Sequence, residues 1–256
     1  MPVTLNHISG LTLSAAGATA TFGIAAGAAS DSTNADWMAV TSAYTKTTSA
    51  WVLGSAAGAL DTGAIAIGTW YHVFQIKRRD IGTVDYLISL SPSAPTMPAN
   101  YTLFRRIGSL KTDGSSQWVK FFQNGDDFTW DSMVADVNAA TNPGTAAVLR
   151  TLTVPTGIKV EAKIAVVGSG LAGDPGPGAI YISDPAVADN AATINSHLTL
   201  ASYTPNSGAL VGQLSAQARV FTDTSARVRS RCQLSNANTR LDINTIGWID
   251  RRGRDG

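Results

Sequence analysis

Short runs in which apolar and polar residues alternate are the clearest pattern along the chain. Residues 69–78, "TWYHVFQIKR", place Trp70, His72, Phe74 and Ile76 on one face of a predicted strand. Residues 84–90 repeat the pattern after a glycine-containing turn, which predicts a β-hairpin. Residues 101–134 predict three further strands that meander, the last two joined at Asn124-Gly125, a typical tight-turn pair.

The region after residue 148 predicts a second β domain. It contains seven short strand-like runs separated by turn residues, a pattern typical of a β-sandwich or jelly roll. The segment "VNAATNPGTAA" precedes them and predicts a linker. We therefore expect an N-terminal β region with a meander over residues 1–136, a linker over 137–147, and a C-terminal β-sandwich over 148–256.

Composition supports an all-β fold and leaves the packing of the N-terminal quarter open. Glu161 is the single glutamate, and the chain is rich in Thr, Ser, Gly and Ala, which disfavours long helices. Residues 1–68 contain one Lys or Arg, Lys46, and many small residues. They predict either short strands around a thin core or a surface that neighbouring chains complete.

Bulk charge and hydropathy argue against two classes of partner. The formal net charge is +1, so no long-range field favours nucleic acid or an anionic membrane. The sequence has no run of eighteen apolar residues, and we expect no membrane insertion. The first ten residues lack the basic and apolar pattern of a signal peptide.

A glycine motif at Gly168, Gly170 and Gly173 matches the GxGxxG pattern of dinucleotide sites. In such sites a helix follows the motif, whereas here Pro175 and Pro177 exclude one. Asp189 lies where the ribose ligand would be sought, but it does not end a second strand. We predict no nucleotide cofactor and interpret the motif as a glycine-rich loop joining two antiparallel strands.

Candidate catalytic and metal-binding groups are sparse in the sequence. The three histidines, His7, His72 and His197, lack metal-ligand spacing, so we expect no metal, and His72 fits a packed sheet position. Cys232 is the single cysteine, which fits a small buried apolar residue. No GxSxG motif is present, and the acidic cluster Asp126, Asp127 and Asp131 lies beside a turn glycine, where Asp is common. We predict that the protein is not an enzyme.

An arginine row is the one candidate binding feature. Arg227, Arg229 and Arg231 share a strand face opposite Val228, Ser230 and Cys232. Two interpretations stay open. The row is structural, paired with Asp223, Asp242 or Asp250, or it contacts an anionic partner such as a phosphate or an acidic subunit surface.

Several segments together resemble a group of structural proteins from tailed bacteriophages and prophages, described as tail-fibre or virion proteins. They are "FGIAAGAASDSTNADWM", "TKTTSAWVLGSAAGALDTGAIAIGTWYHVFQIKRRDIGTVDYLISLSPSAPTMPANY", "RRIGSLKTDGSSQWVKFFQNGDDFTW", "TLTVPTGIKVEA" and "IGWIDRRGRDG". The resemblance covers most of the chain, is strongest over residues 61–130, and brings no catalytic residues.

The resemblance implies a virion appendage subunit that assembles in the host cytoplasm. Its expected partners are further copies of the chain, most simply in a trimer, other virion proteins, and a glycan or protein of the host surface. By analogy with phage fibres, residues 1–68 would attach to the particle and the region after residue 148 would be more exposed. The alternatives are a glycan-degrading tail enzyme and a head decoration or collar protein.

Overall fold

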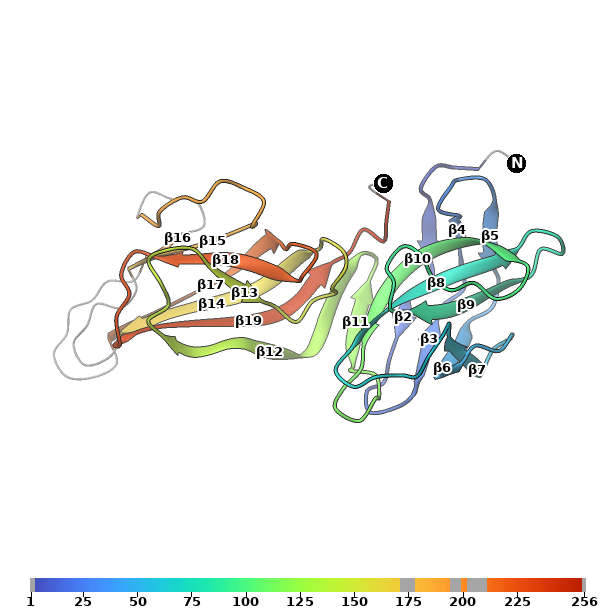
Figure 1. Cartoon of the computed structure of the whole chain (residues 1–256), viewed down its shortest axis with the longest axis horizontal. Helices are drawn as coiled ribbons and strands as arrows, with labels where there is room; N and C mark the ends of the chain where they lie inside the picture. The colour runs from blue at the N-terminus through green and yellow to red at the C-terminus, as the bar shows by residue number, and fades with distance from the viewer. Residues whose placement is uncertain (1–2, 171–177, 194–198, 202–210, 255–256) are drawn as a thin grey trace. The chain divides into compact units, whose positions relative to one another are not determined.

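The computed structural model describes residues 3–170, 178–193, 199–201 and 211–254, and every regular element among them is a β-strand (Figure 1). The predicted all-β fold is therefore confirmed. Within this part of the chain no helix is present that could cross a membrane. The chain divides into two compact units, residues 1–131 with 250–256 (unit 1) and residues 132–249 (unit 2).

Unit 1 is built from short strands in the N-terminal quarter and longer strands after residue 70. They are β1 (Ile8–Gly10), β2 (Leu13–Ser14), β3 (Thr21–Ile24), β4 (Gly27–Ser30), β5 (Trp37–Val40), β6 (Tyr44–Ala50), β7 (Ala57–Leu60), β8 (Trp70–Arg78), β9 (Val84–Ser89), β10 (Tyr101–Lys111), β11 (Phe121–Asn124) and the start of β12 (Asp127–Thr141). The N-terminal quarter thus contains the short strands that its sequence predicts.

Most of these strands form one curled mixed sheet in the order β10-β8-β9-β7-β6-β3-β2. Single β-bridges connect both ends of the sheet to the segment around Trp118: Ala15 pairs with Phe121, and Thr112 pairs with Trp118. Gly108 of β10 allows close packing across the interior, because a Cβ there would lie 2.6 Å from Leu13 Cδ1. A separate three-stranded sheet has the order β1-β4-β5.

Both faces of β8 are buried, although its alternation predicts one apolar face. On one face, Phe74 and Ile76 pack with Leu87 and Tyr101 in a cluster that Trp51, Met97 and Phe104 border. On the other face, Tyr71 meets Trp118, with ring centroids 6.0 Å apart. The strand therefore contributes to two layers of apolar packing, which sequence periodicity alone does not reveal.

Two buried ion pairs lie within the described part of unit 1. Lys46 Nζ is 3.2 Å from Asp85 and also donates to the carbonyl oxygens of Val52 and Gly54, so its three protons have acceptors. The guanidinium of Arg106 forms two parallel hydrogen bonds of 2.6 and 2.7 Å with the carboxylate of Asp250. Each pair compensates a charge that would be costly to bury alone.

The Arg106–Asp250 pair makes the end of the chain part of unit 1. Asp250 also accepts a 2.8 Å hydrogen bond from the backbone N–H of Arg252. Burial raises the pKa of Asp250 and is the largest single effect, but the charge and hydrogen bonds of Arg106, the backbone N–H of Arg252 and the charge of His72 together outweigh it, and the net pKa lies below the usual 3.8. The carboxylate is therefore charged at neutral pH and holds the segment after β19 against β10.

Unit 2 is a β-sandwich, as predicted. Its strands are the rest of β12, then β13 (Val148–Thr151), β14 (Glu161–Gly170), β15 (Ala179–Ser183), β16 (Thr199–Ala201), β17 (Val211–Phe221), β18 (Arg227–Cys232) and β19 (Thr239–Ile249). The sheet of order β11-β12-β19-β14-β17 faces a four-stranded sheet of order β13-β18-β15-β16 (Figure 1). All seven strand-like runs expected after residue 148 are strands.

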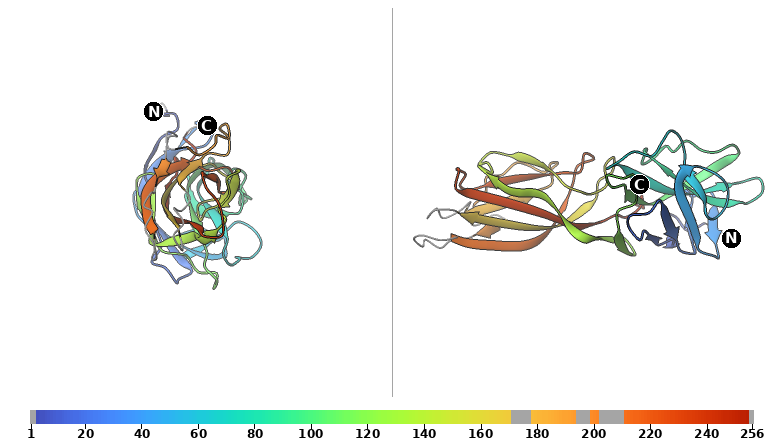
Figure 2. Two further views of the ribbon diagram at one scale, coloured as in Figure 1. Left: turned by 90° about the vertical axis from the view of Figure 1, so that its left-hand side faces the viewer. Right: turned by 90° about the horizontal axis from the view of Figure 1, so that it is seen from below.

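The boundary between the units differs from the prediction. The segment expected as a linker, residues 137–147, begins inside β12, which continues to Thr141 beside β19 (Figure 2). Residues 250–256 belong to unit 1 and not to the C-terminal domain. Pro143 and Gly144 end the strand. The Ala- and Asn-rich residues before them pair with β19, and their composition does not predict this pairing.

Two expected connections are also corrected. The hairpin β8–β9 and the turn at Gly125, with φ of 61°, are confirmed, but β10 pairs with β8, so residues 101–134 do not meander. The strands on either side of the glycine motif, β14 and β15, lie in different sheets and do not pair with each other. Gly168 and Gly170 lie within β14, and Gly173 is outside the described residues.

Replacing Asp250 with Asn should lower the free energy of unfolding by about 3–5 kcal/mol, because Arg106 would remain buried without a counter-charge. Urea denaturation at neutral pH measures the change. The difference from the wild type should shrink as the pH falls below 3.8, because the wild-type carboxyl is then protonated first in the unfolded state and, at lower pH, also in the folded state. The control Asp80→Asn breaks an exposed pair with Arg78 and should change the free energy of unfolding far less. Equal effects of the two variants would contradict the structural role of the buried pair.

Candidate functional site

The arginine row predicted from the sequence lies on β18 of unit 2. Val228, Ser230 and Cys232 alternate with the three arginines and are buried, as the strand pattern requires. Arg229 is also buried, with 7% of the residue exposed, whereas Arg227 and Arg231 are partly exposed. The central arginine therefore does not present a free guanidinium to a partner.

Each arginine of the row has an internal carboxylate. Arg227 lies 2.8 Å from Asp223, as one interpretation expected. Arg229 and Arg231 share Asp189, at 3.4 and 3.1 Å. Arg229 also donates to Ser183 Oγ and to the carbonyl oxygens of Val187 and Ala188. These contacts tie β18 to the loop that follows β15 and favour the structural interpretation.

The other carboxylates considered for the row lie elsewhere. Asp242 accepts a hydrogen bond from the backbone N–H of Ala139, and Asp250 pairs with Arg106 in unit 1. Asp189, which its position in the sequence made a candidate ribose ligand, instead forms ion pairs with Arg229 and Arg231. The sequence does not assign Asp189 to the row, because Asp189 follows β15 and β15 is separated from its partner β18 by more than forty residues of sequence.

Candidate chemical groups named from the sequence are also engaged in packing. His72 is 1% exposed, and its Nδ1 lies 2.9 Å from Ser109 Oγ, as expected of a packed sheet histidine. Cys232 is 1% exposed, and burial raises the pKa of its thiol to about 12, which makes a thiolate rare at neutral pH. Among the described residues, no three His, Cys, Asp or Glu side chains are grouped so that they could hold a metal.

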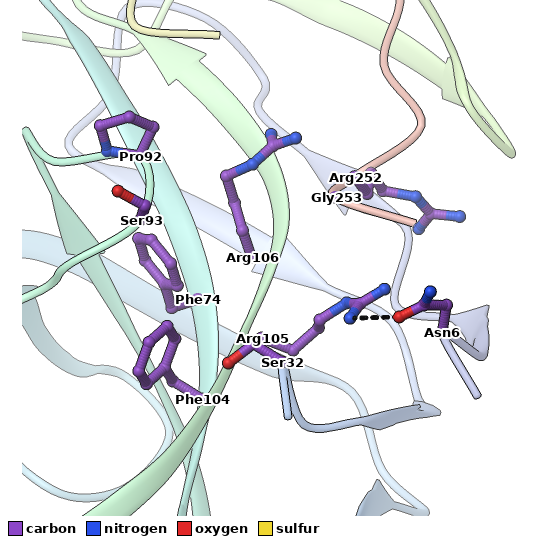
Figure 3. A pocket seen from close by; sticks show the side chains of 10 residues that line it. All are labelled: Asn6, Ser32, Phe74, Pro92, Ser93, Phe104, Arg105, Arg106, Arg252 and Gly253. Atoms are coloured by element: carbon purple, nitrogen blue, oxygen red, sulfur yellow. Dashed lines mark hydrogen bonds between the residues drawn. The ribbon is translucent and has the colours of Figure 1, made fainter. Parts of the chain in front are cut away.

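A pocket in unit 1 brings together residues that the sequence gave no reason to group. Its volume is about 220 Å³. Phe74, Phe104, Pro92 and Ser93 lie on one side, Arg105, Arg252 and Asn6 lie on the other, and Arg106 lies between them (Figure 3). The two sides come from β8, β10, the segment after β9, and the ends of the chain. The pocket is therefore apolar on one side and cationic on the other.

The three guanidiniums differ in how they are compensated. Arg106 is paired with Asp250, and Arg252 donates to Asp126 at 3.0 Å. Arg105 is 3% exposed, and its Nη1 donates a 3.3 Å hydrogen bond to Asn6 Oδ1. Its Nε and Nη2, like Nη1 of Arg252, have no acceptor among the residues that the structure describes.

The electrostatics around Arg105 are unfavourable for a buried cation. Burial and then the neighbouring charge of Arg106 lower the pKa of Arg105, and Arg254 and Arg252 act in the same direction. Asp31 opposes them, but its carboxylate caps the backbone N–H groups of Thr33, Ala35 and Asp36. An arginine stays charged even so. The arrangement therefore concentrates positive charge around buried N–H donors of Arg105 and Arg252 that have no acceptor among the described residues.

The signals for this pocket in the sequence are the pairs Arg105-Arg106 and Arg251-Arg252. Two adjacent arginines in a strand must point to opposite faces, so at least one is directed toward packed residues in a sheet that is buried on both faces. The sequence does not predict that these two arginine pairs lie close together, because their proximity depends on the long-range contact between Arg106 and Asp250.

Comparison with known proteins assigns no family to the chain. No protein-family model matches the sequence, and no curated protein matches it significantly.

Replacing Arg229 with Ala should lower the free energy of unfolding by about 2–3 kcal/mol, because Asp189 and two loop carbonyls lose a charged donor. Arg227→Ala is the matched control and should cost less than about 1 kcal/mol, since that side chain is 40% exposed. Urea denaturation measures both changes. An Arg229→Ala protein as stable as the wild type would show that the row is not structural.

Proposed function

We propose that this protein is a non-enzymatic structural subunit of a tailed-bacteriophage virion, most simply of a fibre or related appendage. The resemblance to such proteins runs over most of the chain and is strongest over residues 61–130. That stretch includes β8, β9, β10 and β11, which belong to unit 1. An all-β architecture of two units suits an appendage subunit, although fold alone does not specify function.

The observation that carries the non-enzymatic part of the proposal is the state of the clustered carboxylates. Asp126 is paired with Arg252 and Arg254, and Asp131 lies 2.9 Å from Lys120. Asp127 accepts a 3.2 Å hydrogen bond from Thr129 Oγ1. A glycosidase needs one carboxyl group held protonated and a second group placed across the substrate. These three side chains instead stabilise the β11–β12 hairpin and the end of the chain.

Exposed apolar side chains support assembly with other subunits. Among the described residues of unit 1, seven side chains of this kind are more than half exposed: Leu5, Val52, Leu53, Ile67, Ile81, Leu90 and Phe122. Such residues are common singly on soluble proteins but also occur where subunits meet. We propose a homotrimer in which unit 1 contacts the particle or its neighbours, and in which unit 2 is more exposed.

Quantitative mass spectrometry of purified virions tests this function. The chain should be present at a fixed copy number that is a multiple of three, and light scattering of the purified protein should give three times 26.6 kDa. Gold-labelled antibodies should then place it on an appendage. Absence from washed particles would contradict the proposal. Release of reducing ends from host polysaccharide by the purified protein would favour the glycan-degrading alternative.

A further inference from the structure

Lys46 and Asp85 of unit 1 form an ion pair from which solvent is excluded. Both side chains are 0% exposed, and Nζ of Lys46 lies 3.2 Å from each carboxylate oxygen of Asp85. Because the carboxyl carbon Cγ lies between those two oxygens, Nζ faces Cγ. By contrast, the side chains of the Lys120–Asp131 pair are each 42% exposed. The buried pair therefore places a nitrogen nucleophile against a carboxyl carbon without competing water.

The fold brings these two residues together across a strand of small side chains. Lys46 lies on β6 and Asp85 lies on β9, and β7 lies between the two strands in the sheet (Figure 1). The sequence of β7 is Ala-Gly-Ala-Leu, and its first residue, Ala57, is the sheet partner of Lys46. These short side chains leave room for the lysine to reach across β7 to Asp85. The loop between β6 and β7 then contacts its amine through the carbonyl oxygens of Val52 and Gly54.

The hydrogen bonds of Lys46 suit a neutral amine as well as an ammonium group. Two of its three protons are accepted by the carbonyl oxygens of Val52 and Gly54, at 2.9 and 3.1 Å. Transfer of the third proton to Asp85 leaves an amine whose two N–H groups are held by the loop, so its lone pair points to the carboxyl group. Burial lowers the pKa of Lys46 and raises the pKa of Asp85, and both shifts favour this transfer.

A backbone donor also contacts the carboxyl group. The N–H of Gly54 donates a 3.1 Å hydrogen bond to Oδ2 of Asp85. When a nucleophile attacks Cγ, negative charge develops on the carboxyl oxygen, and a fixed N–H group in a dry site stabilises that charge. Gly54 therefore orients the amine through its carbonyl oxygen and the carboxyl group through its N–H.

We propose that Lys46 and Asp85 join in the folded protein as an intramolecular isopeptide bond. One proton of the ammonium moves to Oδ1, and Nζ attacks Cγ to form a new N–C bond. A second proton moves from the nitrogen to Oδ1, the Cγ–Oδ1 bond breaks, and one water molecule leaves. The amide keeps one N–H for a loop carbonyl and keeps Oδ2 as the acceptor of the Gly54 N–H. The reaction needs no oxidant and no further reactant.

The product removes two charges from the interior, whose burial is costly even when they are paired. It also closes the chain between residues 46 and 85 into a covalent loop. Such a loop restricts the unfolded state and so stabilises the fold, as a disulfide does. The inference rests on the buried pair alone and does not depend on the proposed virion role.

Intact-mass spectrometry of the denatured full-length protein tests the proposal. The wild-type chain should be lighter than its sequence mass by one water molecule. Trypsin should not cleave after Lys46, because its amine is blocked, and the digest should contain residues 1–77 linked to residues 80–105. A chain of full sequence mass would overturn the proposal. Loss of water without the linked peptides, as in a succinimide, would overturn it as well.

Variants locate the reacting groups. Lys46→Met removes the nucleophile and Asp85→Ala removes the carboxyl carbon, so each variant should have its full sequence mass and yield no linked peptides. Lys77→Met is the matched control, because it breaks a partly exposed pair with Asp36 and should still lose one water molecule. Loss of water in Lys46→Met would contradict the assignment. The measurement on the wild type is decisive even where a variant does not fold, because it needs no substitution.

Discussion

The ion pair between Arg106 and Asp250 is the contact on which unit 1 depends. It joins residues that are 144 positions apart through two short hydrogen bonds between buried side chains. Without this pair, the segment after β19 would lose the buried ion pair that connects it to β10. With it, Arg252 and Arg254 are brought to Asp126, and the start of the β11–β12 hairpin is tied to the end of the chain.

The same pair explains why a cationic pocket exists. Placing Arg252 near β10 concentrates guanidiniums around Arg105, and the available carboxylates are committed elsewhere: Asp250 to Arg106, Asp126 to Arg252 and Arg254. Unit 2 shows the contrasting case, in which Asp189 is shared by Arg229 and Arg231 and the row is internally compensated. The difference in compensation, and not the number of arginines, distinguishes the two clusters.

The sequence predicts local structure here better than it predicts pairing. Alternation locates the β8–β9 hairpin and the seven strands after residue 148, since each depends on neighbouring residues. The position of β10 beside β8, the continuation of β12 through residue 141, and the separate sheets of β14 and β15 depend on partners far along the chain. For the same reason the sequence singles out Arg227, Arg229 and Arg231, which repeat visibly. It does not single out Arg105, whose importance arises from residues near both ends of the chain.

The most direct test of this account is amide hydrogen exchange of the wild type and Asp250→Asn under native conditions. If the pair organises unit 1, β8, β10 and residues 252–254 should lose protection in the variant, while β14, β18 and β19 of unit 2 keep theirs. Unchanged protection across β10, or an equal loss in both units, would contradict the claim that Arg106 and Asp250 hold unit 1 together.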